Sequence, residues 1–327
     1  MTDTVTAIVV SYNTADLTVE ALRGLHEHSG PKLVRTIVVD NASDDGSADA
    51  IASNCPWVDL VRMQDNIGFA RAVNLAAARA TTDHLLLLNP DVVVDSDIVD
   101  PLVDFARRHP RGGLWGGRTL HPSGAVDPRS CWGLPSPWST VCFALGLSTL
   151  LKRNPVFDPE SLGRWNRDSE REVGMVSGCL LLVRRDLWQQ LGGFDERYFM
   201  YGEDADLAFR ARTQGWRPAI TPTATIVHYV GASSPTARKR ELVMRAKATL
   251  VRTHLPRPAL HVALLVFGTR LRAVANHLLG MRRPEGRDRS WAPLARQPAT
   301  WTAGWPSAGS PVSSAEPTGE TNARIQA

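Results

Sequence analysis

The sequence has few cysteines and no regular spacing among them. Four occur in 327 residues, at positions 55, 131, 142 and 179, and no two form a C-x-x-C pair. This argues against a disulfide framework or a structural zinc site, and it fits a reducing compartment. The N-terminus also lacks a basic segment followed by an apolar run, so it indicates no signal peptide. We therefore expect a cytoplasmic protein.

Several common motifs are missing too. No G-x-G-x-x-G follows the first predicted strand, and no G-x-x-x-x-G-K-[ST] occurs, so the dinucleotide fingerprint and the P-loop are both absent. The G-x-S-x-G elbow of α/β-hydrolases is absent as well. What remains to be explained is a chain rich in strand-like segments and carboxylates.

Charge is divided unevenly along the chain. Residues 1–235 hold 22 Lys and Arg against 28 Asp and Glu, a net of −6, whereas residues 236–296 hold 14 against three, a net of +11. Basic segments attract phosphate, either on anionic lipid or on nucleic acid. The second segment lacks a base-reading motif and the acidic body opposes DNA, so we expect no nucleic-acid partner and favour a membrane surface.

The first hundred residues alternate between short apolar runs and amphipathic helical patterns. The runs that predict buried strands are Thr6–Ser11, Leu33–Asp40, Val58–Met63 and His84–Asn89. Alternation of strand and helix is typical of an α/β fold with a mostly parallel sheet and helices on both faces. We assign residues 1–235 to this domain.

Later segments are less regular. Residues 120–170 hold six prolines and predict an irregular insertion over the mouth of the sheet. A strand is predicted at Met175–Val183, a helix at Glu203–Gln214 and a strand at Thr223–His228. Residues 297–327 are rich in Pro, Ser, Thr, Ala and Gly, which predicts a disordered tail.

Polar residues follow each of the first four predicted strands. Ligands of open α/β sheets bind beyond the carboxyl ends of the strands, so four polar clusters at one edge predict a site. One such residue alone could simply cap the next helix. The clusters are Ser11-Tyr12-Asn13, Asp40-Asn41-Ala42-Ser43, Asn66-Ile67-Gly68-Phe69 and Asn89-Pro90-Asp91.

This ordered set of motifs resembles glycosyltransferase family 2, whose members have the GT-A fold. Gly192-Gly193-Phe194-Asp195-Glu196, Tyr201-Gly202-Glu203-Asp204-Ala205-Asp206 and His228 extend the resemblance, which covers roughly residues 4–235. Within the family the chain is most similar to actinobacterial rhamnosyltransferases that act on polyprenyl-diphosphate-linked sugars.

The resemblance implies roles for residues at the sheet edge. Asp40 would accept the N3–H of a pyrimidine base, a strong hydrogen bond because the acceptor is ionised. The other residues expected to bind the nucleotide-diphosphate sugar are Val10, Ser11, Tyr12, Asn13, Asn41, Asn66, Gly68, Arg71, Asn89 and Asp91.

The resemblance also implies a metal and a base. Asp91 and His228 would hold Mg²⁺ or Mn²⁺, although Asn89 stands where the family's D-x-D motif has its first carboxylate. An imidazole suits Mn²⁺ better than Mg²⁺. Asp204 would be the general base of an inverting transfer, with Glu203 as the alternative and Asp206 as a structural residue.

The acceptor and the donor sugar leave alternatives open. Asp195 could bind an acceptor hydroxyl or only cap its turn. The donor implied by the resemblance is dTDP-L-rhamnose and the acceptor is a lipid-linked saccharide; a UDP- or GDP-sugar is the alternative. A nucleotidyltransferase would carry a glycine-rich basic loop after the first strand, and Ser11-Tyr12-Asn13-Thr14 is not one.

The segment 236–296 predicts an amphipathic basic arm. Its longest apolar run, Leu260–Gly268, is far below the ~20 residues of a membrane span. Six apolar residues recur at steps of four and three, with Arg270, Arg272 and Asn276 off their stripe. This favours a helix lying on the inner face of an anionic membrane, although the stripe could instead pack on the body or on a second subunit as a homodimer. The six are Leu260, Leu264, Phe267, Leu271, Val274 and Leu278.

Overall fold

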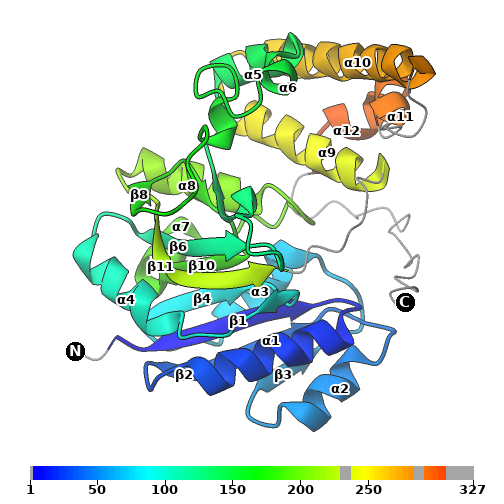
Figure 1. Cartoon of the computed structure of the whole chain (residues 1–327). Coiled ribbons are helices and arrows are strands. Elements are labelled where there is room, and N and C mark those ends of the chain that lie inside the picture. The colour runs from blue at the N-terminus through cyan, green and yellow to red at the C-terminus, as the bar shows by residue number, and fades with distance from the viewer. Residues whose placement is uncertain (1–2, 229–236, 283–290, 307–327) are drawn as a thin grey trace.

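A computed structural model describes residues 3–228, 237–282 and 291–306. Within these residues nine strands form one sheet, with helices on both faces (Figure 1). The strands are β1 (Val5–Ser11), β2 (Leu33–Asp40), β3 (Asp59–Arg62), β4 (His84–Leu88), β5 (Val92–Val93), β6 (Leu114–Leu120), β8 (Arg171–Glu172), β10 (Leu180–Arg184) and β11 (Ala219–His228). The helices of this body are α1 (Ala15–His28), α2 (Ser47–Asn54), α3 (Phe69–Ala77), α4 (Val99–Arg108), α7 (Arg185–Leu191) and α8 (Glu203–Thr213).

The sheet is mixed but mostly parallel, as predicted. Its order is β3-β2-β1-β4-β10-β6-β11-β5, with β8 paired to β11. The strand β10 runs antiparallel to both of its neighbours, β4 and β6. The single predicted strand Met175–Val183 is in fact two, because a turn at 177–179 separates β9 (Met175–Val176) from β10, and β9 pairs with β7 (Cys131–Trp132) instead.

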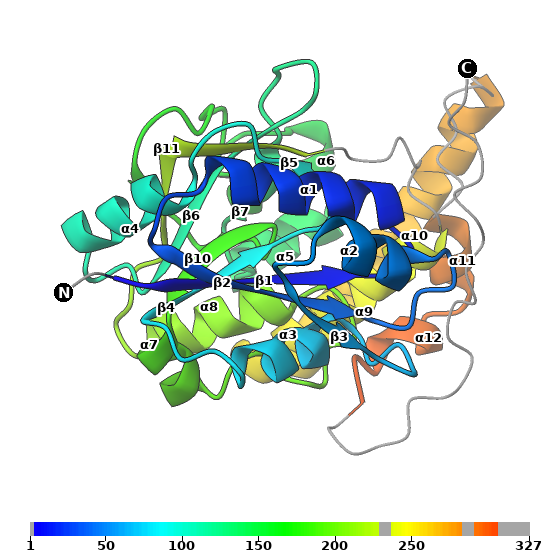
Figure 2. The same cartoon turned by 90° about the horizontal axis from the view of Figure 1, so that it is seen from below.

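Alternation along the central strands divides the core into two layers. Ile8 and Val10 of β1 face α3 and α8, whereas Ala7 and Val9 face α1 and α4. Figures 1 and 2 show α1 and α2 on one face of the sheet and α8 on the other. Each fully buried Val, Ile or Leu stabilises the fold by about 1.5–3 kcal/mol relative to exposure, so this two-sided burial holds the sheet between its helix layers.

The insertion at 120–170 is more ordered than its proline content predicts. It contains η1 (Pro128–Ser130), α5 (Pro137–Ala144), α6 (Leu147–Leu150) and η2 (Pro159–Ser161). Ser136 caps α5 by accepting a hydrogen bond from the Ser139 amide, and Pro137 occupies the first helical turn. The two helices do not cover the mouth of the sheet; they pack beside α10, at the far side of the molecule from α1 and α2 (Figure 1).

The C-terminal segment forms a small helical layer with its own core. Its helices are α9 (Ala237–His254), α10 (Pro258–Arg282), α11 (Trp291–Arg296) and α12 (Ala299–Thr302). Met244, Leu265 and Trp301 meet in this core. The prediction of disorder from 297 is therefore wrong for 297–306, because Trp301 and Trp305 bury their rings there; the remainder, 307–327, lies outside the described residues.

Among the described helices, one is long and apolar enough to cross a membrane by length and composition. It is the span Pro258–Leu278 of α10, with a mean hydropathy of 1.3. One-third of this stretch is buried against the rest of the protein. Such a helix is weak evidence for a membrane span, since a helix packed on a soluble body passes the same test.

Candidate active site

Strand pairing brings the predicted metal ligands together. His228 ends β11 and pairs with Val92 of β5, directly after Asp91. As a result His228 Nε2 lies 3.1 Å from Asp91 Oδ1. The two residues are 137 positions apart in the sequence, and only the antiparallel β5–β11 pair, formed beyond the end of β4, makes them neighbours.

A second carboxylate, Asp127, contacts the other side of the same ring. Its Oδ2 lies 3.4 Å from His228 Nδ1. After β6 the chain reverses through the bridge between Leu120 and Val126, and the Asp127 amide then bonds to the Thr119 carbonyl. Sequence reasoning missed Asp127, since nothing in its spacing from Asp91 or His228 marks it.

These contacts determine the protonation of His228 and Asp127. Burial lowers the pKa of His228, but Asp127 and Asp91 outweigh burial and raise the pKa to about 9. For Asp127, burial raises the pKa, but hydrogen bonds from His228 and Arg129 overcome it and hold the pKa well below its usual range. Asp127 is thus a fully buried carboxylate kept ionised by two partners.

The predicted base lies at the first turn of α8. Gly202, at φ 96°, starts this helix, and a Cβ there would come within 3.0 Å of Tyr198 and Ala246. Asp204 accepts from the Ala205 amide at 2.7 Å. The turn before β10 approaches as well, because the Gly178 amide also bonds to Asp204.

Burial, rather than the helix N-terminus, dominates the electrostatics of this pair. Burial raises the pKa of Asp204 to about 6, against the Ala205 and Gly178 amides. Burial first, and the Asp204 carboxylate second, raise the pKa of Glu203 to about 8. At neutral pH Glu203 keeps its proton and Asp204 is the ionised member.

Asp206 occupies a structural position, as predicted. Its Oδ2 pairs with Arg210 Nε at 2.7 Å, and its Oδ1 lies 2.7 Å from His254 Nε2. Arg210 in turn donates to the carbonyls of Leu191 and Gly193. Asp206 therefore fastens α8 both to the Gly192-Gly193 turn and to α9.

At the β2 end of the edge, one buried oxygen is left unpartnered. Asp40 Oδ1 accepts from the Ser43 amide at 3.1 Å, but Asp40 Oδ2 is buried without a hydrogen bond. A buried acceptor without a donor is costly unless a ligand supplies one. This fits the predicted acceptance of a base N3–H by Asp40.

Asn41, Asn66 and Gly68 support one another. Asn41 Nδ2 donates to Asn66 Oδ1 at 2.9 Å, and the same oxygen accepts from the Gly68 amide at 3.0 Å. Gly68 has φ 82°, and a Cβ there would lie 2.7 Å from the ring and carbonyl of Phe199. These three predicted ligand-binding residues shape the loop before α3, and the glycine is required by the close approach of Phe199.

The residues at the end of β1 and just after it are divided between the interior and the surface. Ser11 is fully buried, and its hydroxyl lies 3.0 Å from that of Thr18. Its side chain therefore points into the protein, and its predicted part in nucleotide binding stays a prediction. Val10 is also buried and belongs to the core. Tyr12 and Asn13 are half-exposed, and Asn13 Oδ1 accepts from the Asp44 amide, which ties the two strand-end loops together.

Three other predicted residues already have intramolecular partners. Asp195 accepts from the Arg197 amide and pairs with its guanidinium at 2.6 Å, which is the turn-capping alternative. Arg71 lies 3.8 Å from Glu196. The Asn89 amide bonds to the Cys179 carbonyl, which joins the end of β4 to the turn before β10.

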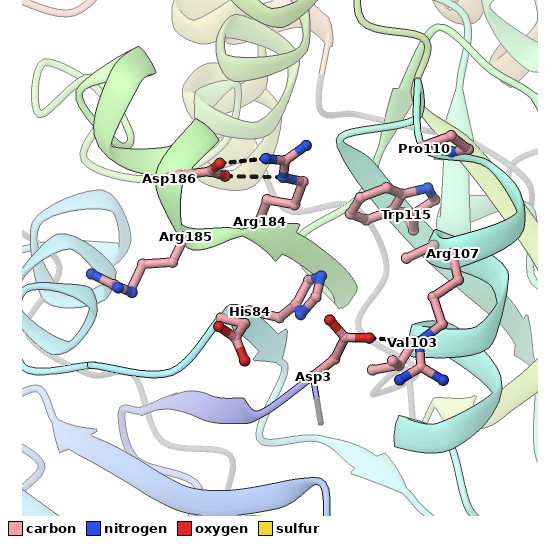
Figure 3. Close-up of a pocket in the computed structure, with 11 residues that line it drawn as sticks. Asp3, His84, Val103, Arg107, Pro110, Trp115, Arg184, Arg185 and Asp186 are labelled. Carbon is pink, nitrogen blue, oxygen red and sulfur yellow. Dashed lines mark hydrogen bonds and ion pairs between the residues drawn. The ribbon is translucent and has the colours of Figure 1, made fainter. Parts of the chain in front are cut away.

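A cavity of about 380 Å³ lies at the opposite edge of the sheet (Figure 3). His84 begins β4, and Arg184 ends the antiparallel strand β10, so both mark the edge remote from Asp91. Two ion pairs lie among the charged groups around it, between Arg184 and Asp186 and between Arg107 and Asp3. This cavity is distinct from the candidate active site.

The mostly parallel sheet, with a histidine and carboxylates at its carboxyl edge, has the architecture of the GT-A fold. Among solved structures, the mannosyltransferase PcManGT of Pyrobaculum calidifontis, in complex with GDP-Man and Mn²⁺, matches with a TM-score of 0.56 at 20% identity, over 91% of this chain and 85% of that one. GalNAc-T7 with UDP, GalNAc and Mn²⁺ matches with 0.55 at 14% identity, over 91% and 54%. These distant structures support the fold alone.

Sequence comparison gives the family. Residues 6–161 match the family described as Glycosyl transferase family 2. The chain is also 33% identical over 265 residues to the N-acetylglucosaminyl-diphospho-decaprenol L-rhamnosyltransferase of Mycobacterium tuberculosis. The aligned region covers 77% of this chain and 84% of that protein. The chain belongs to glycosyltransferase family 2 and is a glycosyltransferase.

Proposed function

We propose that this enzyme transfers L-rhamnose from dTDP-L-rhamnose, with inversion, to a hydroxyl of a lipid-linked saccharide of the N-acetylglucosaminyl-diphospho-polyprenol type. The product would serve cell-wall or surface-polysaccharide synthesis. The similarity to the mycobacterial rhamnosyltransferase carries the choice of donor and acceptor, because it extends over 77% of the chain rather than over the nucleotide-binding half alone.

Asp91 and His228 fit a divalent cation. His228 Nε2 lies 3.1 Å from an Asp91 oxygen, so a nitrogen and an oxygen donor already converge, and a bound cation would replace the proton that His228 otherwise carries there. Among the described residues no group of three or more His, Cys, Asp and Glu is arranged to hold a metal. The remaining ligands would therefore come from the donor diphosphate and water, as is usual for Mg²⁺. When bound, the cation would neutralise charge on the departing diphosphate.

Asp127 would orient the His228 ring for this task. A histidine that binds a metal through one ring nitrogen usually donates its other N–H to a carboxylate or carbonyl, which fixes the tautomer. Asp127 is placed to accept from Nδ1 and so leave Nε2 directed at Asp91. We therefore assign Asp127 as a positioning residue.

Asp204 would act as the general base. In the transfer, the acceptor oxygen bonds to the anomeric carbon as the bond from that carbon to the diphosphate oxygen breaks. The hydroxyl proton passes to the Asp204 carboxylate, and the nucleoside diphosphate leaves. Glu203 is disfavoured because its raised pKa leaves it protonated near neutrality.

A donor screen tests the proposal. Purified enzyme is given a short-chain diphospholipid-linked N-acetylglucosamine with dTDP-L-rhamnose, UDP-galactose or GDP-mannose, each with Mg²⁺ or Mn²⁺. We expect the disaccharide product with dTDP-L-rhamnose, and NMR of the new linkage reports the anomeric configuration. Clear preference for a UDP- or GDP-sugar would replace the donor but keep the family, and retention of configuration would overturn the inverting mechanism.

The lipid-linked acceptor places the reaction at a membrane. We propose that the chain works in the cytoplasm as a peripheral protein on the inner face of the plasma membrane. The net charge of +11 in residues 236–296 supports this location, because anionic headgroups attract basic surfaces.

A further inference from the structure

The apolar stripe of α10 faces solvent rather than the protein. The opposite side of the helix, with Val262 and Leu265, is buried in the C-terminal core. Phe267 and Val274 are 54% and 57% exposed. Within the described residues, therefore, most of the stripe does not pack on the body of the protein, which was one of the alternatives raised by the sequence.

A second segment continues this exposed surface. Leu145, at the corner between α5 and α6, and Leu150, at the end of α6, are 54% and 80% exposed. The corner adjoins the stripe, because a Cβ on Gly146 would lie 3.6 Å from Leu271 Cδ2. We call these exposed side chains together the outer face, which comprises Leu145, Leu150, Leu151, Phe267, Leu271 and Val274.

The two halves of the outer face are fixed to each other. Gly268 lets α10 approach the end of α5, since a Cβ there would meet the Phe143 ring and carbonyl at 2.8 Å. Arg272 donates to the Phe143 carbonyl at 2.6 Å and to Thr149 at 3.0 Å, and its guanidinium lies over the Phe143 ring. Arg272 lies off the stripe, as predicted, and it is a buried cap for α5 and α6.

The two segments that carry the outer face contain charged residues of one sign only. No Asp or Glu occurs between Asp127 and Asp158, or between Glu241 and Glu285, so neither segment of the outer face contains an acidic residue. Lys152 and Arg270 are exposed in these same segments. Exposed apolar side chains with basic neighbours and no acidic residue in either segment match the boundary between anionic headgroups and acyl chains.

We propose that the outer face is a lipid-docking surface that inserts shallowly into an anionic bilayer. The α5–α6 corner is then as much a part of the anchor as α10, and the acceptor lipid would be met from this side. A second copy of the chain would be a poorer occupant, because two such surfaces bring like charges together. A span by α10 would have to break the Arg272 contacts and leave a buried arginine in the membrane. The inference rests on the lipid-linked acceptor of the proposed function.

Vesicle flotation of the full chain tests the surface. Phosphatidylcholine vesicles are compared with and without phosphatidylglycerol at low salt. We expect binding to the anionic vesicles, and the double variant Leu150→Glu with Leu151→Glu should lower the bound fraction about tenfold or more, because two carboxylates would have to enter the apolar boundary. Phe267→Glu should act in the same direction from the other half of the outer face.

A matched control separates lipid docking from general damage. Val34 is 60% exposed at the start of β2, away from the outer face, so Val34→Glu adds the same charge and should leave flotation unchanged. Equal loss in Val34→Glu, or unchanged flotation in the Leu150/Leu151 double variant, would overturn the proposal. So would a dimer in sedimentation that the double variant dissociates without any change in flotation.

The same variants distinguish this inference from the proposed function. With a short-chain acceptor that dissolves in water, the double variant should keep wild-type transfer, and only transfer to acceptor in vesicles should fall. Flotation without transfer to either acceptor would contradict the proposed function but would still support the docking surface. Transfer that is equally reduced on both acceptors would contradict a docking role.

Discussion

Nδ1 of His228 lies 3.4 Å from Oδ2 of Asp127, a residue 101 positions earlier in the chain. The contact fixes the orientation of the imidazole ring, so that Nε2 is directed at Asp91. Because Asp127 is fully buried and is itself held by Arg129, the orientation is built into the fold before any ligand arrives. The predictions below test this arrangement and the adjoining carboxylate pair.

The first prediction concerns the cation. Asp91→Ala removes one of two converging donors, so Mn²⁺ affinity, followed by electron paramagnetic resonance in the presence of nucleoside diphosphate, should fall at least tenfold. EDTA should abolish transfer by the wild-type enzyme, and excess Mg²⁺ or Mn²⁺ should restore it. Full activity in EDTA or in Asp91→Ala would remove the metal from the proposal.

The second prediction separates orientation from folding at Asp127. Loss of a second-sphere partner typically costs about 10–100-fold in metal affinity or activity. Asp127→Asn keeps an oxygen acceptor for Nδ1, so it should retain more Mn²⁺ affinity than Asp127→Ala. Melting temperatures serve as the control, because Asp127 also caps η1 and pairs with Arg129. If the two variants melt alike and bind Mn²⁺ alike, Asp127 does not position His228.

The third prediction assigns the base. Asp204→Asn preserves shape but cannot take a proton, and general-base catalysis contributes about 10²–10⁴-fold. Turnover should therefore fall at least a hundredfold, with donor affinity by calorimetry nearly unchanged. Glu203→Gln, which imitates a carboxyl that is already protonated, should retain most of the turnover. The reverse result would exchange the roles of the two residues.

The fourth prediction is that kcat/KM decreases at acidic pH. Asp204 must be ionised to accept a proton, and burial raises its pKa to about 6. Accordingly, kcat/KM should be nearly constant above pH 7 and should fall about tenfold per unit well below pH 6. A plateau that extends to pH 4.5 would show that no group with this pKa acts as the base.

A related stability measurement checks the same pair. The folded pKa values of Glu203 and Asp204 lie above their unfolded values, so folding favours the protonated forms. Their stabilising contribution is fully present below about pH 4 and is lost as pH rises through about 6 and about 8. Glu203→Gln should therefore flatten the decline in melting temperature between pH 6 and 8. An unchanged slope would mean that Glu203 is ionised in the folded enzyme.

Local patterns in the sequence were sufficient for the body of the fold. The apolar run Leu33–Asp40 is a strand with those same bounds, and the run His84–Asn89 contains β4. Such runs are informative because burial on both faces selects continuous β-branched residues, and polar residues are required where the chain leaves the sheet. The edge bearing Asp40 and Asp91 could therefore be predicted before any coordinates.

Tertiary structure alone decided the rest, because periodicity reports which residues share a face but not what that face meets. The stripe of α10 was readable from spacing, yet only packing shows that it faces outward and is joined by Leu150, whereas Arg272 turns inward to cap α5. Ser11 was predicted to bind the nucleotide from its place at a strand end, and only packing shows that its hydroxyl points inward to Thr18. Asp127 reaches His228 only through a chain reversal after β6 and the β5–β11 pair, two long-range contacts whose partners are chosen by the assembled sheet.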